Sequence, residues 1–249
     1  LLKSIFAKIK DRLFYIIMFQ KIKIPLLTIL AVLFIDQFIK IFIKLNYPLG
    51  EVGRIGDWCV LHFTENPGMA WGLEFGGTFG KLSLSILRVL ACFGGIFYIR
   101  YMIKKGEHKG FIFSVSLILA GAMGNILDSI FYGLIFDKGT VFDPYIQDYM
   151  PYEGIASFTS NGYTSTLHGC VVDMFYFPII EGHFPNWVPI WGGEDFIFFR
   201  PIFNIADVAI SLGVILIIIF QKKFVSNNNA NNSNDEVHKL NNEQVKNEN

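Results

Sequence analysis

The sequence predicts an all-α membrane protein with four transmembrane helices, an N-terminal amphipathic helix and a small extracytoplasmic cap of strands and loops. Hydrophobic residues make up 52% of the 249 residues, which is more than an ordinary soluble domain contains. Four segments also reach the roughly 20 apolar residues that a helix needs to cross a bilayer. They are residues 24–43, 82–103, 111–131 and 203–220.

The two ends of the chain differ from these spans in composition. Residues 1–23 alternate basic and apolar positions, a pattern typical of an amphipathic helix lying on a membrane surface. No small-residue cleavage site follows this run, so we expect a retained helix and not a signal peptide. The polar, Asn-rich tail cannot build a core. We therefore predict one four-span domain at 24–222 and a disordered cytoplasmic tail at 223–249.

The distribution of Lys and Arg predicts the orientation. These residues concentrate before the first span, between the second and third spans, and after the fourth. Because cytoplasmic loops carry the excess of basic residues, we expect both termini in the cytoplasm and the loops 44–81 and 132–202 outside. Segment 57–75, DWCVLHFTENPGMAWGLEF, predicts a short strand pair. The long loop 132–202 is expected to form an ordered cap.

Six polar residues gather at one depth of the predicted bundle, near the outer leaflet. They are Asp36, Lys40, Asn125, Asp128, Asn204 and Asp207. Ionisable groups at membrane depth are costly, which favours a functional role. Two carboxylates placed close together share a proton and can activate water as acid and base. Depth and helix face alone would pair Asp207 with Asp128, because each follows an Asn by three residues.

Structural roles are the alternative for several of these residues. Asp36 and Lys40 stand four residues apart, which predicts an ion pair within the helix. Asn66, in the sequence ENPGMAW, could simply shape a turn. Asn125 and Asn204 could be hydrogen-bonding groups that join helices.

Other chemistries have no matching pattern. The sequence contains no HExxH, GxSxG or CxxC motif, and its net charge is zero without a basic stripe. We therefore predict no metal, no cofactor and no nucleic-acid partner. Cys59 and Cys170 both fall in the outer loops, where we expect free thiols; a disulfide between them is the alternative.

Five segments together resemble the lipoprotein signal peptidase (signal peptidase II) family. In the order of the family they are DQFIK at 36–40, ENPGMAWG at 65–72, GAMGNILD at 121–128, VVDMFYF at 171–177 and FNIADVAISLG at 203–213. The resemblance implies a membrane aspartic protease whose catalytic dyad is Asp173 and Asp207, so that Asp128 becomes a supporting residue. The supporting residues that it implies are Asp36, Lys40, Asn66, Gly68, Asn125, Asp128 and Asn204.

The resemblance also implies a substrate and a location. The family removes the signal peptide of prolipoproteins just before a diacylglyceryl-modified Cys, needs no metal, and is inhibited by globomycin. We expect a monomer in the bacterial inner membrane, in contact with membrane lipids, with its active site at the outer leaflet. A small proton-coupled transporter that uses intramembrane carboxylates is one alternative, and a non-catalytic membrane assembly protein is another.

The chain departs from the family at two places. Arg usually follows the Asp of the third motif, but Ser129 stands here. Arg88, inside the second span, either reaches the outer surface or pairs with a carboxylate, and our hypothesis is that it replaces the missing partner of Asp128. The loops on both sides of VVDM are also longer than usual. We expect them to form a cap over, or a rim beside, the substrate entrance.

Overall fold

The computed structural model describes residues 2–56, 58–68, 77–178, 180–198 and 201–224. The predicted disordered tail falls outside the described residues from position 225 onward, and so do residues 69–75 of the predicted strand pair. The chain divides into two units. One comprises Leu1–Val32, Cys92–Ala120 and Ala209–Asn249, and the other comprises Leu33–Ala91 and Gly121–Val208. The second unit contains every candidate site residue.

In the part of the chain that the structure describes, four helices are long and apolar enough to cross a membrane, and each overlaps a span predicted from the sequence. They are Lys21–Asn46, Gly77–Lys105, Lys109–Ile135 and Ile205–Phe224. Many large apolar side chains on these helices are exposed, among them Phe38 and Phe97. An apolar surface of this kind suits contact with lipid and not with water. The four predicted spans are therefore confirmed as helices of the required length and composition.

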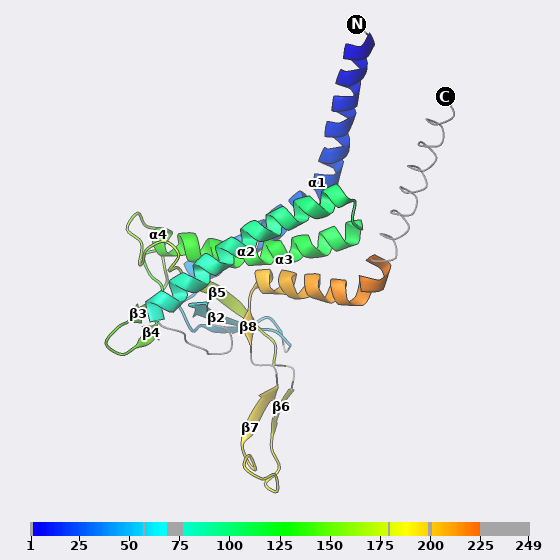
Figure 1. Ribbon diagram of the computed structural model, residues 1–249. Helices are drawn as coiled ribbons and strands as arrows, with labels where there is room; N and C mark the ends of the chain where they lie inside the picture. The colour runs from blue at the N-terminus through cyan, green and yellow to red at the C-terminus, as the bar shows by residue number, and fades with distance from the viewer. Residues whose placement is uncertain (1, 57, 69–76, 179, 199–200, 225–249) are drawn as a thin grey trace. The chain divides into compact units, whose positions relative to one another are not determined.

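The first of these helices belongs to a longer one, α1 (Leu2–Asn46), which continues through Pro25 (Figure 1). The N-terminal segment is thus joined to the first span without a break, and its location on a membrane surface stays a prediction. α2 (Gly77–Lys105) and α3 (Lys109–Leu127) follow. α3 leads into a π-helical turn, η1 (Asp128–Tyr132), and then into the short α4 (Gly133–Ile135). Turns of this kind are frequent at functional sites.

A four-stranded antiparallel sheet, in the order β1-β2-β5-β8, joins the segment after the first span to the long segment before the fourth. Figure 1 labels β2, β5 and β8 of this sheet. Its strands are β1 (Val52–Arg54), β2 (Val60–Asn66), β5 (Val171–Tyr176) and β8 (Ile202–Phe203). The β-branched and aromatic residues of β2 and β5 favour this conformation. Thr64 lies opposite Asp173, and Asn66 lies opposite Val171. The register of this pair therefore fixes where Asp173 lies relative to Asn66.

Two further hairpins lie within segment 132–202, where the sequence predicted a cap. One pairs β3 (Val141–Asp143) with β4 (Asp148–Met150), and the other pairs β6 (Ile180–His183) with β7 (Asp195–Phe198). A hydrophobic core forms where the end of α1, the sheet and the residues after η1 meet. Its buried members are Ile43, Leu61, Phe63, Tyr132, Phe136, Ala156, Val172 and Met174.

A buried ion pair between Lys44 and Glu65 lies beside this core. Glu65 Oε2 also accepts the backbone N–H of Thr140 at 2.6 Å. The Lys44 ammonium lies 4.9 Å from the ring centre of Tyr152 and 5.1 Å from that of Phe136, within the range of a cation–π contact. The pair thus joins the end of α1 to β2 and to the segment that follows α4.

Candidate active site

Asp173 lies in β5, with a side chain that is only 4% exposed. Its Oδ1 accepts a hydrogen bond from Asn204 Nδ2 at 2.6 Å, and its Oδ2 accepts one from Asn66 Nδ2 at 3.3 Å. The short apolar run around it, which the sequence left without an assigned structure, is therefore a strand of the sheet. The strand is too short to span a membrane, and it places the Asp173 carboxylate beside Asn204, directly before the last helix.

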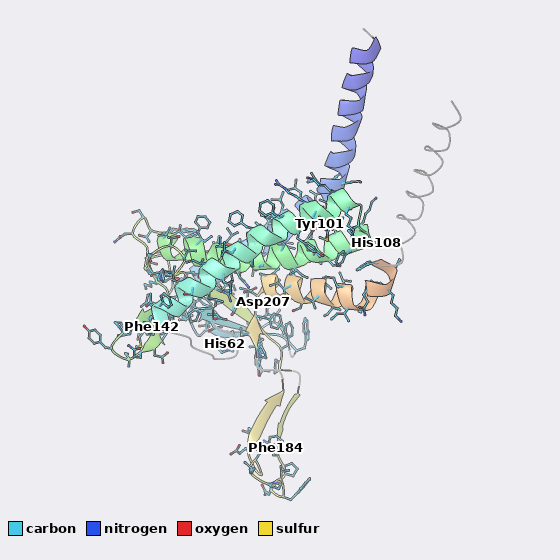
Figure 2. The ribbon with its side chains drawn as sticks, viewed as in Figure 1. His62, Tyr101, His108, Phe142, Phe184 and Asp207 are labelled. Carbon is cyan, nitrogen blue, oxygen red and sulfur yellow. The ribbon has the colours of Figure 1, made fainter. Side chains whose placement is uncertain are left out.

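Asp207 lies in the first turn of the last helix, Ile205–Phe224 (Figure 2). Asn204 stands directly before this helix, at its N-cap position. The Asp207 N–H donates to Asn204 Oδ1 at 3.0 Å, and the Asn204 N–H donates to Asp207 Oδ2 at 3.2 Å. This reciprocal arrangement is a capping box, which satisfies two backbone donors that the helix cannot. An Asp one turn inside an apolar span thus has a local structural reason to be there.

Asn204 brings the two aspartates together. Its side-chain amide donates to Asp173 Oδ1, and its own Oδ1 accepts the N–H of Asp207. Asn125 completes the link, because its Nδ2 donates to Asp207 Oδ1 at 2.9 Å and its Oδ1 accepts from Asn204 Nδ2 at 3.0 Å. Each of these two amides therefore both donates and accepts at the site.

The environment of Asp173 favours its protonated form. Burial, and after it the neighbouring charge of Asp207, raise the pKa of Asp173 to about 7, while the charge of Lys40 and the hydrogen bonds from Asn204 and Asn66 act in the opposite direction. Burial and a like charge are the two causes expected for a carboxyl group in an acid–base pair. At neutral pH this pair can therefore hold one proton between two carboxyl groups.

A second cluster of buried charges supports the first. Lys40 Nζ lies 3.0 Å from Asp36, 2.7 Å from Asp128 and 2.8 Å from Asn125 Oδ1. The predicted ion pair between Asp36 and Lys40 is confirmed. Asp36 Oδ1 also accepts the N–H of Ala206 at 2.9 Å, at the start of the last helix. Lys40 thus connects α1 to the residues that hold Asp207.

Gln37 belongs to this cluster, although the sequence analysis did not single it out. Its Nε2 donates to Asp128 Oδ1 at 2.8 Å and to Asp36 Oδ2 at 3.1 Å, and its Oε1 accepts from the Tyr132 hydroxyl at 3.1 Å. Its position directly after Asp36 in the DQFIK motif is the only sequence signal that could have indicated it. Asp128 accepts bonds from Gln37 and Lys40, so it stands among supporting groups.

The hypothesis that Arg88 is the charge partner of Asp128 is wrong. Asp128 pairs with Lys40, whereas Arg88 Nη2 donates to the carbonyl of Gly68 at 3.3 Å. Arg88 lies near Asp207 and Asp173, because the charges of these two residues act on it. The positive charge beside Asp128 is therefore the ammonium of Lys40 on α1, and not the guanidinium of Arg88 on α2.

Asn66 shapes a turn and also contacts Asp173. Its Oδ1 accepts the N–H of Gly68 at 2.8 Å, which forms a tight turn, while its Nδ2 contacts Asp173. Gly68 has a φ of +104°, and a Cβ there would lie 3.2 Å from Arg88 Nη1. Only glycine adopts this conformation easily, so the turn and the position of Arg88 both depend on it.

The remaining predictions concern thiols and metals. Cys59 and Cys170 are both buried and free, so the disulfide alternative is excluded. Cys170 Sγ donates to the carbonyl of Thr140 at 3.3 Å. Among the described residues, no three His, Cys, Asp or Glu side chains are grouped so as to hold a metal ion. The groups that the structure brings together here are four carboxyl groups, a lysine, an arginine and several amides.

Comparisons with known proteins show the family to which the chain belongs. A family model described as signal peptidase (SPase) II matches residues 28–223. A lipoprotein signal peptidase of Porphyromonas gingivalis is 44% identical over 205 residues, which are 82% of this chain and 85% of that protein. One from Amoebophilus asiaticus is 38% identical and covers 78% of this chain and 75% of that protein. A solved bacterial membrane enzyme aligns with a TM-score of 0.49 and 23% identity, over 82% of this chain and 90% of that one. On the two sequence matches and the family model, the chain belongs to the signal peptidase II family of peptidases.

Proposed function

We propose that this protein removes the signal peptide from lipidated lipoprotein precursors and that Asp173 and Asp207 carry the reaction. The observation that supports this most directly is the bridge made by Asn204, which contacts both aspartates at the junction of a strand and a helix. Membership of a peptidase family argues against the transporter alternative and against a purely structural role. The substrate is a prolipoprotein with a diacylglyceryl-modified Cys.

The two aspartates divide the acid–base work. Asp207 lies at the N-terminal end of a helix, where the helix dipole favours a negative charge, and it acts as the base that removes a proton from water. Asp173, with its raised pKa, carries the shared proton and polarises the scissile carbonyl. Attack of the water on that carbonyl gives a gem-diol. Its collapse breaks the C–N bond, and the departing amine takes up a proton.

The surrounding residues hold this pair and the substrate in place. Asn66, Gly68 and Arg88 form a turn beside Asp173 that positions the peptide backbone. Lys40, with Asp36 and Asp128, holds Asn125 and the start of the last helix, and through them Asp207. These residues act by positioning: Asn66 bonds to Asp173, whereas Arg88 and Lys40 bond to the groups around the two aspartates.

The location follows from the topology predicted by the basic residues. Both termini lie in the cytoplasm, and the site lies at the outer leaflet of the bacterial inner membrane. The acyl chains of the substrate lie among membrane lipids, against the exposed apolar faces of the helices. A globomycin-type inhibitor would occupy the space between the two aspartates, and the protein acts as a monomer. The hairpins β3–β4 and β6–β7 form a cap or rim at the entrance.

The test is cleavage of a diacylglyceryl-modified precursor by the purified full chain in detergent, followed by gel mobility. Asp173→Asn and Asp207→Asn should each reduce cleavage to background, while thermal unfolding shows a folded protein. Asp148→Asn is the matched control, because this aspartate is exposed at the end of the β3–β4 hairpin, and it should cleave at the wild-type rate. Appreciable cleavage by either dyad variant would overturn the assignment.

A further inference from the structure

A buried lysine outside the catalytic cluster has no hydrogen-bond partner. Lys81 lies in the second turn of α2 and is 5% exposed. Among the residues that the structure describes, its Nζ is the one buried side-chain nitrogen or oxygen left without a partner. A buried ammonium without a counter-charge costs several kcal/mol. The Lys81 ammonium therefore lacks a hydrogen-bond acceptor among the described residues.

The groups around Lys81 do not supply a free negative charge. The acids whose charges reach it are Glu65 and Asp128, and these are already ion-paired with Lys44 and Lys40. The nearby thiol of Cys170 is neutral at physiological pH, because burial raises the pKa of Cys170 to about 12. Among the residues that the structure describes, no unpaired acid is therefore left as the counter-charge of Lys81.

Lys81 lines a cavity of about 230 Å³ whose other polar walls carry hydrogen-bond donors. These walls are Thr78, Thr140, Tyr149, Thr164 and His168. Four of them carry a hydroxyl group and one an imidazole ring. His168 Nδ1 lies 3.0 Å from the carbonyl of Thr166 and 3.0 Å from the Ser165 hydroxyl, so the donors available to a ligand are counted from the four hydroxyl groups. Several donors around one ammonium suit a ligand with several acceptor oxygens.

The start of α2 adds a further positive potential to this cavity. Gly77 and Thr78 are the first residues of a 29-residue helix, and unpaired N–H groups and the helix dipole make such an end attractive to anions. The β3–β4 hairpin lies against this end of α2, because a Cβ at Gly77 would lie 2.6 Å from the ring of Phe142. Gly77 also has a φ of +54°, a conformation that favours glycine. Figure 2 shows Phe142 at this end of α2.

We propose that this cavity binds a phosphate group, with the Lys81 ammonium as its counter-charge and the threonine hydroxyls as donors to its oxygens. Lys81 lies one residue before the span predicted at 82–103, the depth at which phospholipid headgroups meet a membrane protein. The phosphate can thus belong to a lipid headgroup or be free in solution. Bound there, it joins α2, the β3–β4 hairpin and the segment 164–168 that leads into β5.

Thermal unfolding of the purified full chain in phosphate-free detergent tests this site without measuring cleavage. Two probes are compared, inorganic phosphate against chloride at equal ionic strength, and short-chain phosphatidylglycerol against a galactosyl diacylglycerol, which lacks phosphate. We expect the phosphate probe that binds to raise the unfolding midpoint by about 3 °C at tenfold its Kd. A rise with both probes, or with inorganic phosphate alone, identifies the phosphate group itself; a rise with the lipid alone identifies a headgroup.

Variants show whether Lys81 is responsible. Lys81→Met should abolish the rise, while its unfolding midpoint without phosphate should equal or exceed that of the wild type, because an unpaired buried charge has been removed. Lys138→Met is the matched control, since Lys138 contacts only an exposed carbonyl, that of Glu153, among the hydrogen bonds described, and it should keep the full rise. Thr164→Val keeps the charge and should reduce the rise, which provides a second test if Lys81→Met does not fold. The proposal fails if neither probe stabilises the wild type, or if Lys81→Met or Thr164→Val keeps the full rise.

Discussion

Asn204, which caps the last helix, donates a hydrogen bond of 2.6 Å to Asp173. The same side chain accepts the N–H of Asp207 at 3.0 Å, so one amide fixes the position of a strand aspartate relative to a helix aspartate. The two carboxyl groups come from β5 and from the last helix, and Asn204 lies 31 residues after Asp173 in the sequence. A cap that ordinarily serves only a helix end therefore also aligns the proposed catalytic pair.

Substitutions of Asn204 should separate its two roles. Asn204→Asp keeps an acceptor for the capped helix end, but it replaces the donor to Asp173 by a third carboxylate. We expect kcat/KM for the lipidated precursor to fall roughly 10- to 100-fold, the range of one hydrogen bond to a charged group, while the protein stays folded at a stability cost of about 1 to 3 kcal/mol, because the added carboxyl group is buried. Asn46→Asp, at the exposed end of α1 where Asn46 bonds to Phe42, should change neither. A loss of activity matched by an equal loss of folded protein would contradict this division.

The raised pKa of Asp173 predicts how activity depends on pH. With a value of about 7, Asp173 loses the shared proton as the pH rises through neutrality, so kcat/KM should fall above about pH 7. The measurement is the initial rate of precursor cleavage between pH 5.5 and 9 at fixed ionic strength. A rate that rises through this range would show that the proton is not needed on this pair.

The same pKa predicts the pH dependence of stability. Asp173 binds its proton more tightly when folded, at about 7, than at the ordinary value of 3.8. The folded protein therefore holds more protons than the unfolded chain between these values, and stability is lost as the pH rises from about 4 to about 7. Asp173→Asn cannot ionise and should flatten that slope in thermal unfolding. An equally steep slope in the variant would assign the effect to other groups.

The spans and most site residues could be predicted because hydropathy and depth are local properties of the sequence. Four apolar runs of the required length sufficed for the helices, and Asp207 stood out as a charge inside one of them. The partner of Asp207 could not be found in this way. The twin spacing of Asn125 and Asp128 pointed to Asp128, whereas the register of β5 with β2 places Asp173 beside Asn66, and a register across 107 residues leaves no local signal.

The role of Arg88 shows the same limit for charges. The depth of Arg88 within its span and the lack of an evident partner for Asp128 suggested that the two residues pair. The depth of a residue in a helix does not determine which faces of neighbouring helices are in contact. Lys40 reaches Asp128 at 2.7 Å because it lies one turn after Asp36 on the face of α1 that contacts η1. The arginine instead meets the turn at Gly68, whose positive φ the sequence indicated only through a Pro-Gly pair.

Arg88→Gln should therefore affect the proposed catalytic pair and leave the Lys40 cluster intact. Removing a positive charge near Asp173 and Asp207 makes their shared proton harder to lose, so the fall in kcat/KM should move to higher pH, with a lower maximum because the turn at Gly68 is less well held. Arg88→Lys should restore the position of the fall in pH but not the maximum, since a lysine cannot reproduce the guanidinium geometry. A pH profile identical to that of the wild type would contradict this placement of Arg88.

The buried pair of Lys44 and Glu65 predicts the largest effect on stability. Lys44→Met leaves Glu65 buried without its cation, and breaking such a pair from one side typically costs about 3 to 5 kcal/mol. Lys44→Met combined with Glu65→Gln should recover most of that loss, because the Gln amide oxygen can still accept the Thr140 N–H. Lys105→Met is the control, since Lys105 is half exposed and its pair with Glu107 should be worth less than about 1 kcal/mol.

The same variants should also change cleavage of the precursor. Because Glu65 directly precedes Asn66 in β2, Lys44→Met should lower the cleavage rate by displacing Asn66, and the double variant should restore that rate. A Lys44→Met protein as stable as Lys105→Met would show that the pair does not hold β2 in place.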